Sequence, residues 1–301
     1  MHLQSAESSP AGHGILGAGA RHMLLAALAF SVMNVFVKQL DRIPAMEIVF
    51  MRCLVSALIC GVGLARARVD WKGNNNALLL ARGTFGTIAL FAFFVTVQNL
   101  PLATAVTIQY LSPIFTALIG VFVLGEHVRP LQWVFYALAF AGVFVLKGFD
   151  AGVPAFYLAT GILSAFAAGV AYNLVRRLRE REHPLVVVLH FQLVGAVAGL
   201  VFCLLRWTAP RPWEWFSLLM CGVLTQLGQV WLTKSLQAEN VAKVSILTYS
   251  GLIYALIFGV VLFGEHYSAR ALLGIALVML GVVLSVLYSR RKRVAVASAP
   301  I

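Results

Sequence analysis

The chain has 301 residues, of which 61% are hydrophobic and 11% are charged, and its formal net charge is +12. Soluble domains contain about 45–50% apolar and about 25% charged residues, so this composition excludes a soluble enzyme, a disordered tail and a disulfide scaffold. A helix needs about 20 apolar residues to cross a bilayer, and ten such helices would use about 200 residues. We therefore expect an all-α integral membrane protein with short loops.

Ten apolar runs follow one another along the chain, separated by charged residues, prolines and asparagines. The predicted transmembrane helices are 22–40, 45–65, 77–97, 102–124, 131–149, 155–175, 185–206, 213–234, 243–263 and 270–288. No interval between them is long enough for a soluble domain. The runs are continuously apolar and do not alternate with polar residues, which disfavours a β-barrel.

Basic residues are distributed unevenly between the two sides of this predicted bundle. With a cytoplasmic N-terminus, the loops and ends on that side hold sixteen Lys and Arg residues, against six on the other side. This count assigns Arg82 to the loop before the third span. Cytoplasmic loops are enriched in Lys and Arg, so the bias predicts an even number of spans and two cytoplasmic termini. Anionic membrane lipids then account for the positive charge, and no nucleic-acid partner is needed.

The second half of the chain repeats part of the first. Residues 98–146 align without a gap to 237–285, and 13 of 49 positions are identical, including Tyr110 and Tyr249. Each half contains five spans, so the halves must enter the membrane in opposite directions. Inverted repeats of this kind are typical of secondary transporters, whose substrate binds near the midplane. The expected organisation is an N-terminal tail, two five-helix repeats and a basic C-terminal tail, at 1–20, 21–150, 151–288 and 289–301.

Polar side chains within the spans are the candidate binding residues, because a polar group that faces lipid is costly. Thr225, Gln226, Gln229 and Thr233 share one face of the eighth span. They could form the wall of a cavity, or they could bond to neighbouring helices. The same alternatives apply to the other uncharged candidates, which are Asn34, Gln109, Tyr110, Tyr172, Asn173 and Tyr249.

Pro113 lies in the middle of the fourth span and should bend it, because proline removes a backbone donor. Its repeat mate is Leu252, so we expect no equivalent kink in the second half.

Three ionisable residues lie within spans, namely Glu47, Arg52 and His190. Each could bind a charged substrate group or carry a coupling proton. The alternative for Arg52 is that it extends outward to the membrane interface. The alternatives for Glu47 are that it caps its own helix or pairs with Lys38.

Glu126 and Glu265 each follow a glycine at the end of a span. Their duplication favours a structural role, in which the glycine ends one helix and the carboxylate accepts N–H groups of the next. The inverted repeat places them on opposite membrane faces, about 30 Å apart or more, which excludes a catalytic carboxylate pair. No catalytic, metal-binding, nucleotide-binding or cofactor motif occurs elsewhere, so we expect no enzyme activity.

The stretches Leu100–Ala103, Tyr110–Pro113 and Val123–Glu126 resemble the end of each half in EamA-type members of the drug/metabolite transporter superfamily. The second half repeats the pattern from Ala242 to Glu265 without the proline. The resemblance covers about residues 22–288. It implies ten spans, a central cavity lined by spans 1, 3, 4, 6, 8 and 9, and alternating access by rocking of the two halves.

These features predict an inner-membrane secondary transporter, and an exporter of a small organic metabolite. Only Arg52 lies well inside a predicted span, which disfavours phosphorylated substrates, since these need several convergent cations. Amino acids and amino-acid-derived compounds such as opine-type metallophores remain. The alternatives are an importer or a drug efflux transporter, and a membrane-embedded enzyme is disfavoured. A coupling proton or counter-substrate is expected, and the protein could be a monomer or a homodimer.

Overall fold

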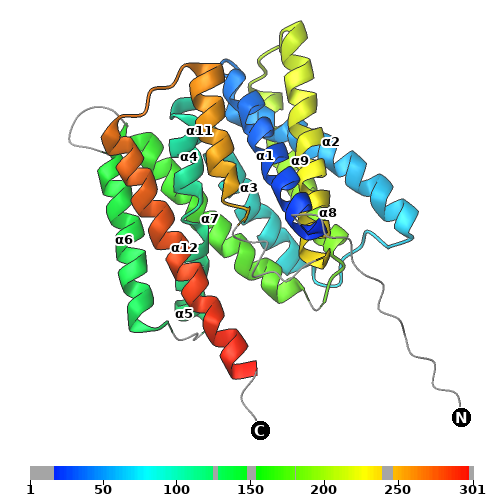
Figure 1. The fold of residues 1–301 in the computed structure, drawn as a ribbon. Coiled ribbons are helices and arrows are strands. Elements are labelled where there is room, and N and C mark those ends of the chain that lie inside the picture. The colour runs from blue at the N-terminus through cyan, green and yellow to red at the C-terminus, as the bar shows by residue number, and fades with distance from the viewer. Residues whose placement is uncertain (1–16, 125–127, 148–153, 180, 239–246, 298–301) are drawn as a thin grey trace, which may run out of the picture.

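The computed structural model describes residues 17–124, 128–147, 154–179, 181–238 and 247–297. Within these ranges all regular secondary structure is helical (Figure 1). The helices are α1 (Ala18–Gln39), α2 (Ala45–Ala67), α3 (Asn76–Asn99), α4 (Leu102–Gln109), α5 (Ser112–Leu124), α6 (Pro130–Lys147), α7 (Ala155–Leu178), α8 (Pro184–Leu205), α9 (Pro212–Ala238), α11 (Ser250–Phe263) and α12 (Ala269–Ala297).

Prolines set many of the helix starts. Proline occupies the N-cap of α2, α4 and α7, and it is the first residue of α6, α8 and α9. Its φ angle suits the first turn of a helix, and its missing N–H is not needed there. The breaks between the predicted spans therefore coincide with the observed loops.

The predicted spans are confirmed as apolar helices in the described part of the chain. Nine segments there are long and apolar enough to cross a membrane, and α4 with α5 counts as one of them, Leu102–Phe122. Helix α11 is a shorter apolar helix. It covers most of the predicted span 243–263, whose first four residues lie outside the described ranges. The protein is therefore a multi-pass helical membrane protein.

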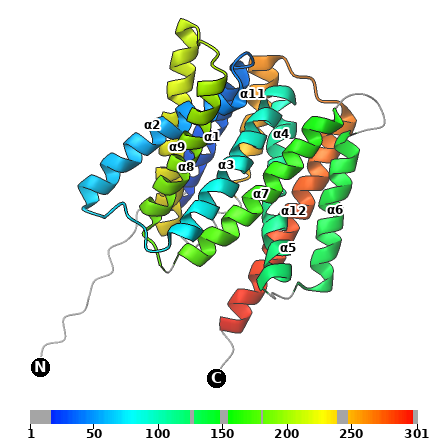
Figure 2. The same ribbon diagram turned by 180° about the vertical axis from the view of Figure 1, so that it is seen from behind.

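The helix packing has the symmetry of an inverted repeat. Helix α1 packs along α9, and the repeat-related helices α7 and α3 pack along each other in the same way (Figure 2). The pairs α2–α8 and α6–α12 each join a helix to its own repeat mate, and α4 of the first half packs against α11 of the second. The first half thus packs against the second along almost every helix.

The bundle has two ends that matter for the site. The beginning of α1 and the end of α12 lie at the same end, which we call the terminal end (Figure 1). Helices α1 and α3 finish at the opposite end, where α4 begins, and we call this the distal end. An even number of membrane crossings accounts for this arrangement.

Candidate functional site

Two helix breaks meet at the centre of the bundle. Helix α4 stops at Gln109, and Tyr110 and Leu111 form a turn before α5. In the second half, Thr248 and Tyr249 form the equivalent turn before α11. The expectation that the kink is confined to the first half is therefore wrong. The break does not depend on Pro113, because a turn with i to i+3 hydrogen bonds forms at both positions.

Side chains of the first half donate hydrogen bonds to backbone carbonyl groups at the break in the second half. The Tyr110 hydroxyl donates to the Thr248 carbonyl oxygen at 3.0 Å. The Ser31 hydroxyl of α1 donates to the Gly251 carbonyl oxygen at 3.3 Å. In a membrane interior no water competes for such groups, so a non-helical backbone needs partners of this kind.

Tyr110 and Tyr249 are repeat mates that touch. Their ring centroids are 5.0 Å apart, and the rings meet edge to face at 75°. Two residues exchanged by a two-fold axis can contact each other only beside that axis. The tyrosine pair therefore marks the centre of the inverted repeat, and Gly251 makes room for it, since a Cβ there would lie 2.6 Å from the Tyr110 hydroxyl.

Buried polar atoms without hydrogen-bond partners surround this centre. They include Asn34 Oδ1 on α1, Thr107 Oγ1 on α4, Gln226 Oε1 on α9 and Ser250 Oγ on α11. These helices pack against one another, α1 with α9 and α11, and α4 with α11. An unpaired buried polar group costs about 1–3 kcal/mol. Four such groups on adjoining helices are typical of a site that receives a polar ligand or water.

Two arginines flank the ring of Phe191 on α8. The guanidinium carbon of Arg52 on α2 lies 5.7 Å from the ring centroid, and that of Arg82 on α3 lies 4.5 Å from it. Arg52 is 5% exposed, and its Nε donates to Thr225 Oγ1 at 3.0 Å. It therefore does not extend to the interface.

The position of Arg82 differs from the one assumed in the sequence-based charge count. It lies seven residues into α3 (Asn76–Asn99), within the predicted span, and its Nε and Nη1 atoms are buried without a partner. It is thus an interior cation and not a loop residue. Sequence reasoning missed it because the basic cluster at 66–72 lies just ahead of it.

Tyr172 on α7 connects the arginines to the tyrosine pair. Its side chain is 50% exposed, although it lies within electrostatic range of both Arg82 and Tyr110. Tyr110 and Tyr249 are in contact, and Tyr172 interacts electrostatically with Tyr110, so these three predicted site residues lie near one another.

Other predicted site residues bond between helices or within their own helix. Gln109 accepts a hydrogen bond from Ser164 of α7 at 2.7 Å. The Asn173 amide donates to the Thr116 carbonyl of α5 at 2.9 Å. His190 Nδ1 lies 2.9 Å from the Val186 carbonyl of its own helix. Gln229 is half-buried on α9, beyond the buried Gln226.

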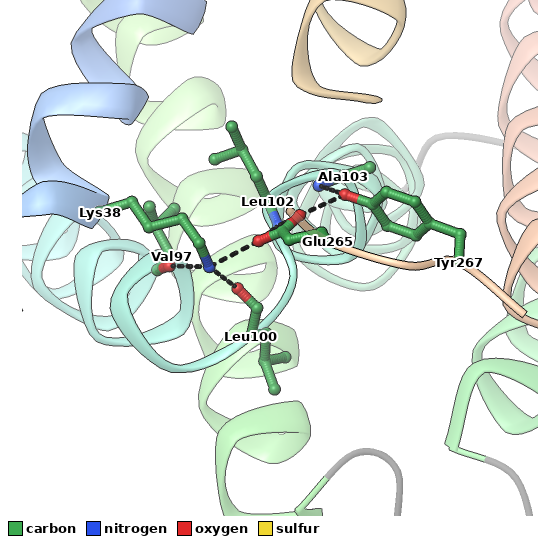
Figure 3. Close-up of polar contacts among 7 residues, drawn as sticks. All are labelled: Lys38, Val97, Leu100, Leu102, Ala103, Glu265 and Tyr267. Atoms are coloured by element: carbon green, nitrogen blue, oxygen red, sulfur yellow. Dashed lines mark hydrogen bonds and ion pairs between the residues drawn. The ribbon is translucent and has the colours of Figure 1, made fainter. Parts of the chain in front are cut away.

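The distal end is bridged by a second polar cluster, drawn in Figure 3. The Lys38 ammonium at the end of α1 lies 2.8 Å from Glu265 Oε1 and donates to the Leu100 carbonyl at 2.6 Å. The Glu265 carboxylate accepts the Leu102 N–H, the first of α4, at 2.8 and 3.0 Å. We call Lys38, Glu265 and Tyr267 the distal latch.

The latch corrects one expectation about Glu265. The carboxylate does cap a helix, as the sequence predicts, and Gly264 before it has the left-handed φ of +61°. The capped helix is α4 of the first half, however, and not the following helix α12, whose first turn bonds to Ser268 instead. Glu126 lies outside the described residues. Lys38 does not pair with Glu47, whose Oε1 accepts the Thr208 N–H.

Tyr267 completes the distal latch. Its hydroxyl donates to the Glu265 carboxylate and accepts the Ala103 N–H at 3.2 Å. Burial, together with the hydrogen bond to Glu265, raises the pKa of the Tyr267 hydroxyl. The hydroxyl therefore stays protonated and keeps donating to the carboxylate.

Comparison with known proteins matches both halves of the chain to one family. The EamA-like transporter family model matches residues 17–147 and again 155–287. The pseudopaline exporter CntI of Pseudomonas aeruginosa is 32% identical over 285 residues, 93% of this chain and 98% of the relative. Solute carrier family 35 member G1 of Homo sapiens is 25% identical over 83% of this chain and 73% of its own. A crystal structure at 22% identity superposes with a TM-score of 0.62 over 91% of this chain and 98% of its own, which shows the fold.

Proposed function

The chain belongs to the EamA-like transporter family, and from that premise we propose that it is a secondary transporter that exports a small amino-acid-derived metabolite. Opine-type metallophores are the favoured class, since a relative that is 32% identical over nearly its full length is named a pseudopaline exporter. The cargo passes from the cytoplasm across the inner membrane. No catalytic step is part of this function.

The observation that carries the proposal is the contact between Tyr110 and Tyr249 at two repeat-related helix breaks. Broken helices at the midplane of inverted repeats are where secondary transporters bind their substrates. The unpartnered polar atoms of Thr107 and Ser250 beside these breaks, with those of Asn34 on α1 and Gln226 on α9, provide the hydrogen-bonding groups of such a site. A neutral or zwitterionic metabolite would satisfy them.

The distal latch supports alternating access. It joins α1 and α4 of the first half to the loop between α11 and α12 of the second, so these elements cannot part at the distal end while it holds. With the termini in the cytoplasm, the distal end faces the periplasm. The latch is then the contact that breaks when the site opens outward, driven by a proton or a counter-substrate.

The test uses membrane vesicles of both orientations from cells that express the chain. Candidate metabolites are first identified as compounds enriched in the medium of expressing cells over cells that carry the empty vector. Each compound should then accumulate in inside-out vesicles, because these reproduce export. Accumulation in right-side-out vesicles alone would make the protein an importer. Transport confined to apolar cationic drugs would favour a drug efflux transporter.

The orientation has its own test. Single cysteines at residues 290–293 should react with an impermeant thiol reagent only when the cytoplasmic face is accessible. Labelling of intact spheroplasts at these positions would reverse the assignment of the distal end to the periplasm.

A further inference from the structure

Two positive charges share one aromatic ring inside the bundle. Both guanidinium carbons lie within 6 Å of the Phe191 centroid, Arg82 at 4.5 Å and Arg52 at 5.7 Å. The arginines come from α2 and α3 of the first half, and the ring comes from α8 of the second. Such a contact is attractive because the ring face carries negative potential, but it does not neutralise either charge.

No acidic side chain compensates the pair in the part of the chain that the structure describes. The ion pairs found there are Lys38–Glu265 and Arg42–Glu214. Glu47, the acid on α2, bonds to the backbone of Thr208 instead. An uncompensated charge inside a membrane protein is expensive, and ionisable residues kept there are usually functional. Two uncompensated arginines side by side are therefore suited to bind an anion.

The pair is held in place by its neighbours. Thr225 on α9 accepts the Arg52 Nε–H and donates to the Cys221 carbonyl, which orients the hydroxyl. On α3, a Cβ at position 86 would overlap Arg82 Nη1, so Gly86 is what lets the arginine fold back against Phe191. A site with preset donors costs little to order when its ligand binds.

Buried polar atoms of Arg82 and of α8 lack hydrogen-bond partners. These are Arg82 Nε and Nη1 and both side-chain amide atoms of Gln192, the residue that follows Phe191 in α8. Tyr172, which is half exposed, interacts electrostatically with both Arg82 and Tyr110.

We propose that Arg52, Phe191 and Arg82 form the subsite that receives two carboxylate groups of the transported metabolite. A guanidinium matches a carboxylate as two parallel hydrogen bonds, and two guanidinium groups match two such groups. The inference rests on the proposed function and names the charge of its substrate. The sequence-based argument against anionic substrates assumed that Arg52 was the single interior arginine. Because Arg82 is also interior, that argument no longer applies.

The experiment measures binding to the purified full-length protein by thermal shift and by titration calorimetry. The probe is N-(1-carboxyethyl)alanine, which carries two carboxylates, and its monoamide and inorganic phosphate are the comparison compounds. The wild type should bind the probe at least about tenfold more tightly than the monoamide, since one charged hydrogen-bonded pair is lost. Arg52→Gln and Arg82→Gln should each weaken binding of the probe by about tenfold to a hundredfold.

The control variant is Arg66→Gln, which removes an exposed arginine from the last turn of α2 and should leave binding unchanged. Arg82→Lys should fall between wild type and Arg82→Gln, because it keeps the charge and loses the fork. Equal binding of probe and monoamide, or binding that survives both glutamine variants, would overturn the proposal. So would failure of the wild type to bind the probe, or tighter binding of phosphate that both arginines support.

Transport separates this inference from the proposed function. If vesicles move a neutral metabolite and both glutamine variants move it at the wild-type rate, the subsite is wrong while the exporter stands. If the probe binds through both arginines but no vesicle orientation accumulates it or any identified metabolite, the exporter is wrong while the anion site stands.

Discussion

The Lys38 ammonium lies 2.8 Å from the Glu265 carboxylate, and the two residues come from opposite halves of the inverted repeat. Their side chains are only 14% and 10% exposed, so the pair is screened less than a surface salt bridge. Because the same carboxylate caps α4, the pair ties α1 to two other elements of the bundle. A motion that opens the bundle between α1, α4 and the α11–α12 loop at the distal end must break this pair.

Glu265→Gln should loosen the distal latch without removing the cap. The amide oxygen can still accept the Leu102 N–H, but the charge that holds Lys38 is gone. We expect a shift towards the distal-open state of about tenfold, about 1.4 kcal/mol, the scale of a partly buried charged hydrogen bond. The readout is the rate at which an impermeant thiol reagent, applied at the distal face, modifies a cysteine introduced at Thr107.

Arg42→Gln is the matched control for this measurement. It breaks the other ion pair, to Glu214, which joins the α1–α2 loop to α9 (Pro212–Ala238). Helices α1 and α9 pack along their lengths, so this pair does not hold the distal opening closed. Equal labelling rates in Glu265→Gln and the wild type would show that the latch does not control access.

Glu265→Ala should lower stability more than it lowers substrate affinity. It removes the carboxylate that accepts the first N–H of α4, and loss of a helix cap costs about 0.5–2 kcal/mol. It also leaves the largely buried Lys38 ammonium without a carboxylate partner, next to two backbone carbonyls and the Phe263 ring. Thermal unfolding in detergent should order the proteins as wild type, Glu265→Gln, then Glu265→Ala. A variant with normal stability and lost substrate binding would place Glu265 in the binding site instead.

Gly251 and Tyr110 should behave as a coupled pair. A Cβ at Gly251 would lie 2.6 Å from the Tyr110 hydroxyl but 3.9 Å from the ring carbon that bears it. Gly251→Ala alone should therefore destabilise the protein by about 1–3 kcal/mol, the usual cost of overpacking. Tyr110→Phe alone should cost about 1 kcal/mol, because the Thr248 carbonyl loses one of its two donors and keeps the Gly251 N–H.

The double variant tests the geometry directly. Without the hydroxyl, the new methyl group meets no atom of Tyr110 closer than ordinary contact, so the double variant should be more stable than the sum of the single effects predicts. A double-mutant cycle on the free energy of unfolding measures this coupling. Strict additivity would mean that the two helix breaks do not meet as described.

The spans and the centre of the repeat are predictable from sequence because their causes are local. Apolar runs and prolines set the helices, and the alignment pairs Tyr110 with Tyr249 as repeat mates. That the two rings touch, and so lie beside the symmetry axis, is shown by the structure and not by the alignment.

The missed features depend on tertiary contacts. Glu265 was expected to cap the next helix, since sequence proximity is the only available guide, whereas its carboxylate reaches Leu102 in the other half. Arg82 was assigned to a loop because basic residues near a span start usually face water. Only the packing of α3 against α8, with Phe191 and Gly86 in place, shows that its guanidinium turns inward.

The variant Gln226→Leu tests whether the Gln226 amide serves the ligand or bonds between helices. The side chain is 8% exposed, and its Oε1 has no hydrogen-bond partner. If the amide serves the ligand, leucine should hold or raise the free energy of unfolding, by up to about 1 kcal/mol, because an unsatisfied polar atom disappears. Transport in inside-out vesicles should nevertheless fall at least about tenfold, as expected for a lost substrate hydrogen bond.

The companion variant is Gln229→Ala, one turn further along the same face of α9. It should also reduce transport and leave the yield of folded protein near normal, since its side chain is only half-buried. If Gln226 instead bonds between helices, Gln226→Leu should lose stability and transport together. Unchanged transport in both variants would remove this face of α9 from the substrate path, and the site would then be confined to the tyrosine pair and the arginines around Phe191.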